Sequence, residues 1–324
     1  MLTTRRKDDG AARRTTGPRT GGRRTRLSSA VLAAVVAASL IAGCGDDNGG
    51  ADSSSSDPSV LRVGLIPNVA PETQKAKYAP FAAYLEKTLG KKVELFVASN
   101  YTGVVAALVA GKLDLAYLGG LTYVQARQKV KLIPVVTEID QETGTEKYFS
   151  VIVTQTDSGV NSIKDLDGKD FAFGDPSSTS GSLYPRIMLT AAGVKCSSTT
   201  LDSCPPLRKV VFTGGHDAAL AAVQSGQVAA AGVEKRILTS LEKKKTIDAS
   251  KIKIIESHEV QGYPWVVPAS LDAKLRADIV KAFESITDPT LLDLLRAKAY
   301  KAVAAADYDE IELEARRLGL LAGK

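Results

Sequence analysis

Hydrophobic and polar positions from about residue 60 onward alternate between a strand pattern and a helix pattern. Residues 61–67 and 92–98 are short runs rich in aliphatic side chains, and residues 78–89 between them carry apolar side chains at helical spacing. Parallel strands need a crossover connection, which a helix provides. This β-α-β order therefore predicts an α/β fold with mainly parallel sheets.

A weak internal repeat predicts two similar lobes. Residues 107–116 and 222–231 both show the pattern of a helix end, a glycine and a strand, and Gly111 and Gly226 are placed as left-handed helix caps. The 265 residues that begin at Val60 also exceed the size at which a single hydrophobic core usually divides. We therefore expect two lobes.

Two extended segments, residues 148–153 and 263–267, are the candidates for strands that cross between the lobes. The first lobe is then discontinuous, comprising 60–150 and 262–324, and the second lobe comprises 151–261. Two helices joined by a short connection are expected to close the chain. A ligand is expected between the lobes, at the carboxyl ends of the strands, where open α/β sheets place their sites.

The N-terminal region has the pattern of an export signal. Its first 26 residues hold nine basic side chains against Asp8 and Asp9, and residues 27–43 are uncharged and rich in alanine. The apolar part of this stretch is too short for a membrane span. Residues 1–43 are therefore predicted to be a signal peptide, exported by the Sec or the Tat route.

The signal ends in the sequence Leu-Ile-Ala-Gly-Cys, in which the cysteine is Cys44. This resembles the lipobox of bacterial lipoproteins, where a lipid-modified cysteine becomes the first residue after cleavage. It predicts an extracytoplasmic protein anchored to the cell membrane by lipidated Cys44; an ordinary membrane anchor with an incidental cysteine is the alternative. Residues 44–59, rich in Gly, Asp, Asn and Ser, are predicted to be a flexible tether.

Charge and cysteine content narrow the possible partners. The first 26 residues carry +7 and the whole chain carries +6, so the exported part carries −1 and nucleic acid is not an expected partner. Cys196 and Cys204 lie in a polar loop and are placed to form a disulfide outside the cytoplasm. No nearby histidine completes a metal site, so we predict no metal and no other cofactor.

The most informative motif is a strand, a hydroxyl-rich turn and a helix over residues 171–189. The consecutive residues Ser178, Thr179 and Ser180 stand where the helix begins. Hydroxyls and free backbone N–H groups at a helix N-terminus suit an oxyanion such as phosphate or phosphonate. The alternative is an ordinary N-cap, for which one serine suffices.

A second motif, Gly-Gly-His-Asp, places His216 at the start of another predicted helix. Its imidazole can donate a hydrogen bond to an anion in the cleft. A surface or helix-capping role for His216 is the alternative.

These motifs resemble those of the phosphate, phosphite and phosphonate substrate-binding lipoproteins of ABC transporters, and the similarity runs through nearly the whole exported chain. The matching segments are Gly64-Leu-Ile-Pro67, Ala98-Ser-Asn-Tyr101, Asp114-Leu-Ala-Tyr-Leu-Gly119, Phe173-Gly-Asp-Pro-Ser-Ser-Thr-Ser-Gly181, Gly214-Gly-His-Asp217 and Pro264-Trp-Val-Val267. The resemblance implies a type II periplasmic-binding-protein fold. It also implies that the oxyanion is held by Ser178, Thr179, Ser180, His216, Tyr101 and Tyr148.

Two positions depart from the family pattern. Tyr263 stands where members commonly carry an aspartate that recognises a protonated oxygen, and Arg236 stands where the aminoalkylphosphonate binders have a glutamate for the ligand amine. A more anionic ligand, or a larger one stacked among Tyr101, Tyr117, Tyr148 and Tyr263, is therefore favoured. The alternative is that Arg236 and Glu234 simply face water.

The sequence thus predicts a monomeric solute-binding protein that captures a small anionic ligand, a phosphorus oxyanion, and delivers it to an ABC permease. The same fold binding a nucleoside or nucleotide between the tyrosines is the runner-up. A secreted hydrolase and a sensor lipoprotein are alternatives of other classes. The hydrolase is disfavoured because no Gly-x-Ser-x-Gly elbow, His-Glu-x-x-His or P-loop motif is present.

Overall fold

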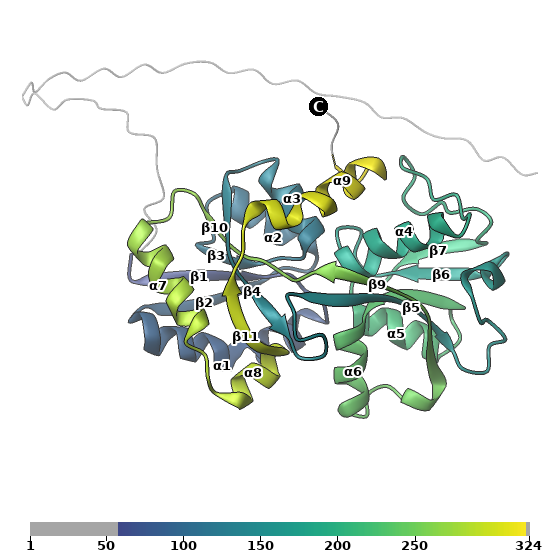
Figure 1. The fold of residues 1–324 in the computed structure, drawn as a ribbon, viewed down its shortest axis with the longest axis horizontal. Helices are drawn as coiled ribbons and strands as arrows, with labels where there is room; N and C mark the ends of the chain where they lie inside the picture. The colour runs from purple at the N-terminus through teal and green to yellow at the C-terminus, as the bar shows by residue number, and fades with distance from the viewer. Residues whose placement is uncertain (1–57, 322–324) are drawn as a thin grey trace, which may run out of the picture. The chain divides into compact units, whose positions relative to one another are not determined.

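The computed structural model describes residues 58–321. The predicted signal peptide, Cys44 and most of the predicted tether lie outside them. The described residues contain two sheets, which form the centres of two lobes (Figure 1).

The first lobe is built on a six-stranded sheet of order β11-β4-β10-β3-β1-β2. Its strands are β1 (Val60–Leu65), β2 (Lys92–Val97), β3 (Leu115–Tyr117), β4 (Leu132–Asp140), β10 (Trp265–Pro268) and β11 (Ala297–Ala302). Its helices are α1 (Pro71–Leu89), α2 (Tyr101–Val109), α3 (Gly120–Arg127), α7 (Ala273–Glu284), α8 (Pro289–Leu295) and α9 (Asp309–Arg317), with a short 3₁₀ turn, η4 (Ala305–Tyr308).

The second lobe is built on a five-stranded sheet of order β7-β6-β8-β5-β9. Its strands are β5 (Lys147–Gln155), β6 (Asp170–Phe173), β7 (Lys209–Phe212), β8 (Ala230–Glu234) and β9 (Ile252–Gln261). Its helices are α4 (Tyr184–Ala191), α5 (His216–Gln224) and α6 (Lys235–Lys243), with short turns η1 (Ile163–Leu166), η2 (Thr179–Leu183) and η3 (Ala249–Lys251).

The predicted α/β fold with two lobes is confirmed, but its strand directions are more mixed than the sequence predicts. Parallel pairs join β1 to β2 and β3, and β6 to β7 and β8. The strands that follow the crossings, β5 and β10, pair antiparallel with their neighbours, as do β9 and β11. None of these antiparallel pairs joins two strands that a helix connects directly in the chain, so the helical crossover that enforces parallel pairing does not apply to these pairs.

The predicted end of the chain needs correction. The helices α7 and α8 form as expected, with Pro289 in the first turn of α8, but β11 and α9 then follow. β11 has the sequence AKAYKA, which has no β-branched residue. Its long-range pairing with the edge of β4, and not local propensity, makes it a strand.

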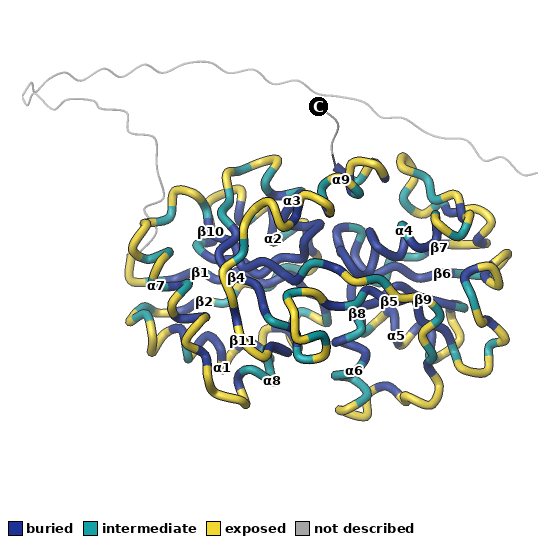
Figure 2. The backbone as a smooth tube through the Cα atoms, viewed as in Figure 1, coloured by how far each residue is buried: buried dark blue, intermediate teal, exposed yellow. Residues whose placement is uncertain are grey.

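The interior strands of the second sheet, β5, β6 and β8, are buried on both faces (Figure 2). In β5, Val151 and Val153 face one hydrophobic core, whereas Ile152 faces another on the opposite side. This follows from the two-residue period of a strand. It also explains why the segment reads as a continuous apolar run and not as an alternating one.

Two segments cross side by side between the sheets: the link from β4 to β5 and the link from β9 to β10 (Figure 1). The backbone N–H of Gly262 on the second donates to the Glu146 carbonyl on the first at 2.7 Å. A Cβ on Gly262 would lie 2.6 Å from that oxygen, so only glycine permits this approach.

Candidate ligand-binding site

The predicted strand, turn and helix are present over β6, η2 and α4, and the turn carries the three consecutive hydroxyl residues Ser178, Thr179 and Ser180. The helix opens with a π-helical turn, η2, for which Ser178 is the N-cap: its Oγ accepts from the Gly181 N–H at 3.0 Å. Each of residues 177–184 is at least nine-tenths buried. Buried hydroxyls need hydrogen-bond partners, so burying this turn costs free energy unless its hydroxyl groups form hydrogen bonds.

Thr179 connects the two lobes. Its Oγ1 accepts from the Leu121 N–H at the start of α3, at 2.9 Å, and the Thr122 hydroxyl donates to the Ser177 carbonyl at the same distance. The hydroxyl proton of Thr179 remains available to a ligand, because an accepting hydroxyl still has its own proton to donate.

Tyr101 and Tyr148 reach the turn from different lobes. Tyr101 follows the N-cap Asn100 at the start of α2, and Tyr148 lies on β5. Burial raises the pKa of both phenols. Both phenols therefore stay protonated and serve as hydrogen-bond donors.

His216 completes this group from the start of α5. The backbone N–H of Glu234 donates to His216 Nδ1 at 3.2 Å, which assigns the ring proton to Nε2. Burial lowers the pKa of His216 to about 4, against the opposing charge of Glu234, so the ring is neutral at pH 7. A Cβ on Gly181 would lie 2.9 Å from His216 Cε1 and 2.9 Å from Ser178 Oγ, which shows how closely the turn and the ring approach.

We call this group the donor cluster; it consists of Tyr101, Tyr148, Ser178, Thr179, Ser180 and His216. Four of its buried donor atoms have no hydrogen-bond partner among residues 58–321: Tyr101 Oη, Tyr148 Oη, Ser180 Oγ and His216 Nε2. Neutral donors that come from both lobes and share one buried region are suited to an oxyanion.

Tyr117 and Tyr263 do not form an open stacking slot. Their rings stack on each other at a centroid distance of 5.1 Å, and Tyr148 lies 5.2 Å from Tyr263. These separations leave no room for a base between the rings. The arrangement favours a compact ligand over the nucleoside or nucleotide alternative.

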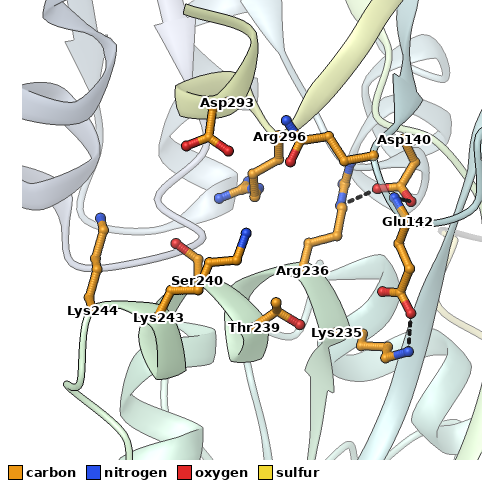
Figure 3. Close-up of a pocket in the computed structure, with 11 residues that line it drawn as sticks. Asp140, Glu142, Lys235, Arg236, Thr239, Ser240, Lys243, Lys244, Asp293 and Arg296 are labelled. Atoms are coloured by element: carbon orange, nitrogen blue, oxygen red, sulfur yellow. Dashed lines mark hydrogen bonds and ion pairs between the residues drawn. The ribbon is translucent and has the colours of Figure 1, made fainter. Parts of the chain in front are cut away.

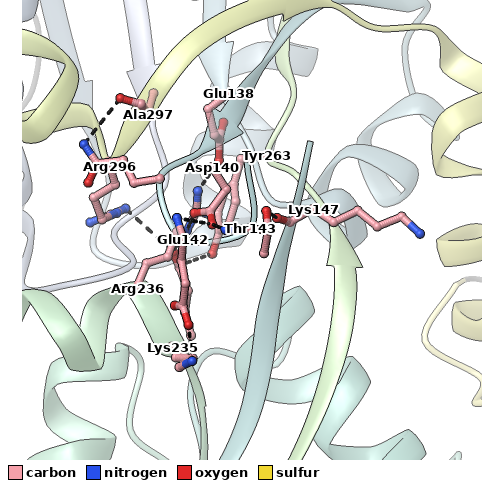
Figure 4. Close-up of polar contacts among 12 residues, drawn as sticks. Glu138, Asp140, Glu142, Thr143, Lys147, Lys235, Arg236, Tyr263, Arg296 and Ala297 are labelled. Atoms are coloured by element: carbon pink, nitrogen blue, oxygen red, sulfur yellow. Dashed lines mark hydrogen bonds and ion pairs between the residues drawn. The ribbon is translucent and has the colours of Figure 1, made fainter. Parts of the chain in front are cut away.

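Arg236 is buried in a group of charged side chains, which we call the charge cluster: Glu138, Asp140, Glu234, Arg236 and Arg296. Figure 4 shows Glu138, Asp140, Arg236 and Arg296. Arg236 contacts Glu138 and Glu234 at 2.7 Å each and Asp140 at 3.7 Å. Glu234 is 0% exposed and Arg236 is 6% exposed, so the alternative that both face water is wrong.

The charge of Arg236 is compensated within the protein. Burial alone would raise the pKa of Glu234, but Arg236 and Arg296 outweigh it and lower this pKa to about 2. The Tyr263 hydroxyl donates to the same carboxylate at 2.6 Å. The expectation that Arg236 selects a more anionic ligand is therefore not supported: its guanidinium lies over the Tyr148 ring, 4.5 Å from the centroid, and is held by acids.

A cavity of about 590 Å³ opens beside the charge cluster (Figure 3). It is lined by residues of both lobes, among them Arg236, Lys243, Asp293 and Arg296. None of the donor-cluster residues lines it. Arg236 and Arg296 at the inner wall of this cavity contact acidic side chains, although Arg236 Nη2 and Arg296 Nε and Nη2 have no hydrogen-bond partner among the described residues. The donor cluster is the stronger candidate for the ligand site, because its unpaired donors are neutral and come from both lobes.

Sequence reasoning missed several residues of this region. Glu138, Asp140 and Arg296 come together with Arg236 only through the fold. Asn68, directly after β1, is 0% exposed, and its backbone carbonyl accepts from the His216 N–H at 3.1 Å. The Ile-Pro-Asn sequence at the carboxyl end of a predicted strand was the available signal for Asn68.

The remaining sequence predictions concern covalent and membrane features. Cys196 and Cys204 form a disulfide. Among the described residues, no group of His, Cys, Asp and Glu side chains is arranged to hold a metal ion. No helix within 58–321 has the length and apolar character needed to cross a membrane.

Comparison with known families identifies the fold and the class of protein. A family described as "ABC transporter, phosphonate, periplasmic substrate-binding protein" matches residues 63–309. The chain belongs to this family. The membership confirms the family predicted from the motifs, and it places the chain among the extracytoplasmic substrate-binding proteins of ABC transporters.

Individual relatives agree with this assignment. The phosphate-import protein PhnD of Mycolicibacterium smegmatis is 37% identical over 171 residues, which are 52% of this chain and 53% of that protein, so the match spans about half the length of that relative. The probable phosphite-binding protein PhnD1 of Prochlorococcus marinus is 28% identical over 279 residues, 81% of this chain and 91% of that protein.

Solved structures support the fold. PhnD1 from Prochlorococcus marinus in complex with methylphosphonate aligns with a TM-score of 0.73 at 27% identity, covering 81% of this chain and 99% of that one. A phosphonate-transporter binding component from Pseudomonas aeruginosa aligns with a TM-score of 0.72 at 21% identity, covering 81% and 87%. The type II periplasmic-binding-protein fold expected from the motifs is confirmed.

Proposed function

We propose that this protein captures a small phosphorus oxyanion (phosphate, phosphite or a small phosphonate) in its donor cluster and delivers it to an ABC permease. The observation that carries the proposal is the set of four buried, unpaired donor atoms, contributed by both lobes. Relatives named for phosphate import and phosphite binding support the ligand class. The protein acts as a monomer, held at the membrane by lipidated Cys44.

Neutral donors suit reversible capture. Each hydrogen bond to a charged oxygen contributes about 1.5–3 kcal/mol, so several together give tight binding. The charge cluster pairs three carboxylates with two guanidiniums, so it adds no net positive attraction for the anion. Separation of the lobes divides the donors between the two sides and releases the ligand.

Isothermal titration calorimetry of the purified protein with phosphate, phosphite and methylphosphonate tests this proposal. At least one of these ligands is expected to bind and to raise the melting temperature. At a ligand concentration of 100 Kd, binding is expected to add about 2.7 kcal/mol to the free energy of unfolding. The double variant Ser180→Ala/His216→Gln is expected to lose most of this binding and to keep its fold.

Failure of all three oxyanions to bind would contradict the proposal. The hydrolase alternative has its own test, the release of p-nitrophenol from p-nitrophenyl phosphate. We expect no turnover, because no carboxylate orients His216: its Nδ1 accepts from a backbone N–H, the reverse of the bond a catalytic triad requires.

A further inference from the structure

Asn68 carries a buried amide without a partner. The residue is 0% exposed, and neither Oδ1 nor Nδ2 has a hydrogen-bond partner within the described chain. Buried side-chain amides are normally satisfied, so an unsatisfied one at a site edge indicates a missing ligand group.

The position of Asn68 links it to the donor cluster. It follows β1, the strand between β2 and β3, so it lies at the carboxyl end of the parallel part of the first sheet. Its carbonyl accepts from the His216 N–H, and the neighbouring Ala70 N–H donates to Asp217 Oδ2 at 3.0 Å. The loop that carries Asn68 is thereby fixed against the start of α5, where His216 lies.

The carboxylates and the ring nitrogen acceptor near the donor cluster already accept hydrogen bonds from the protein, so they are not free to accept one from a ligand. Asp175, the carboxylate next to Tyr101, accepts from the N–H groups of Ser177 and Tyr101 at 2.8 and 3.2 Å. Glu234 accepts from Arg236 and Tyr263. His216 Nδ1 is likewise engaged.

The amide of Asn68 fills this gap. Hydroxyl oxygens can also accept, but around a dianion their protons are directed at its unprotonated oxygens. Asn68 Oδ1 is a pure acceptor, and it is free.

Phosphorus oxyanions differ in their need for such an acceptor. In mildly alkaline solution phosphate and phosphite are both dianions, but hydrogenphosphate keeps one P–OH donor where phosphite has a P–H bond. We infer that Asn68 is a further specificity-determining residue, whose Oδ1 accepts the hydrogen bond from the P–OH of hydrogenphosphate. This inference rests on the proposed function.

Calorimetric titration of the wild-type protein and two variants with both dianions tests the inference. Asn68→Ala is expected to lower the affinity for phosphate about tenfold more than the affinity for phosphite, the usual effect of one such hydrogen bond. Asn68→Asp keeps an acceptor and adds a negative charge that disfavours the phosphite dianion. It is expected to raise the ratio of phosphate to phosphite affinity above the wild-type ratio.

Two control variants isolate the effect of the acceptor. Ser180→Ala removes a donor and is expected to weaken both ligands equally. Gln74→Ala removes another fully buried amide, whose nitrogen donates to the Ile66 carbonyl at 3.2 Å, and is expected to leave the affinity ratio unchanged.

The outcomes of these titrations distinguish the proposed role of Asn68 from the proposed function of the protein. Equal losses for phosphate and phosphite in Asn68→Ala, or no loss, would overturn the inference while leaving the proposed function in place. A wild-type protein that binds neither dianion would overturn the proposed function itself. Unchanged circular dichroism spectra and cooperative melting of each variant show that any loss is not one of folding.

Discussion

Two buried polar regions lie between the lobes of this protein, and they differ in how their groups are satisfied. In the charge cluster every side chain has an ion-pair partner, as Arg236 has in Glu138 and Glu234, although some single atoms, such as Arg236 Nη2 and Arg296 Nε, have no hydrogen-bond partner within residues 58–321. In the donor cluster the groups are neutral, and four donor atoms have no partner within residues 58–321.

The contrast distinguishes structure from function. Burying a charge is expensive unless it is paired, and paired charges have little left to offer a ligand. An unpaired hydroxyl or imidazole N–H costs less to bury, and it regains that cost when an anion binds. Under the proposed function, the charge cluster contributes to stability and the donor cluster to recognition of the ligand.

The largest expected effect comes from Arg236→Met. Removing the guanidinium leaves Glu138 buried without a cationic partner and leaves Glu234 with only the more distant Arg296, which is expected to lower the free energy of unfolding by about 3–5 kcal/mol. The matched control is Lys235→Met, since Lys235 pairs with the exposed Glu142 and should cost no more than about 1 kcal/mol. Chemical denaturation of the ligand-free proteins measures both, and similar small losses would remove the distinction between the two regions.

A pH titration of stability probes the donor cluster through His216. The pKa of the buried ring is about 4 and its ordinary value is 6.5, so between these values only the unfolded chain binds the proton. The contribution of the neutral ring to the free energy of unfolding is fully present above pH 6.5. It is lost as the pH falls toward 4, by at most about 3 kcal/mol.

The variant His216→Gln isolates this contribution, because glutamine keeps an N–H donor and does not titrate in this range. Its free energy of unfolding is expected to depend less on pH between 6.5 and 4 than that of the wild type. Identical pH profiles for the two proteins would show that His216 is not buried as a neutral ring.

A smaller pair of effects with opposite signs comes from two tyrosines. Tyr148→Phe removes an unpaired hydroxyl, so ligand-free stability is expected to rise by about 1 kcal/mol while oxyanion binding weakens by about 1–3 kcal/mol. Tyr263→Phe removes a hydroxyl that donates to Glu234, so ligand-free stability is expected to fall. Thermal melting and calorimetry measure these changes, and a loss of stability in both variants would contradict the comparison.

The sequence predicts the donor cluster better than the charge cluster, for a physical reason. Ser178, Thr179 and Ser180 are adjacent in the chain, and His216 stands at a recognisable helix start, so local patterns reveal them. Glu138, Arg236 and Arg296 lie on β4, on α6 and at the end of α8, and only long-range packing brings them together.

The fold also shows which features local sequence patterns can predict and which they cannot. Gly111 and Gly226 have φ values of +67° and +73°, as their positions after predicted helices require. β11 was not predicted, because its strand conformation depends on pairing with a distant edge. Local signals thus predict the elements and the caps, whereas pairing partners and buried ion pairs require the whole fold.

The most direct test of the central claim is a crystal structure of the protein with inorganic phosphate. The account predicts phosphate oxygens within hydrogen-bond distance of Ser180 Oγ, His216 Nε2 and the hydroxyls of Tyr101 and Tyr148, with Arg236 still bound to Glu138 and Glu234. Phosphate bound instead by Arg236 and the lysines of the neighbouring cavity, with the donor cluster unchanged, would contradict it.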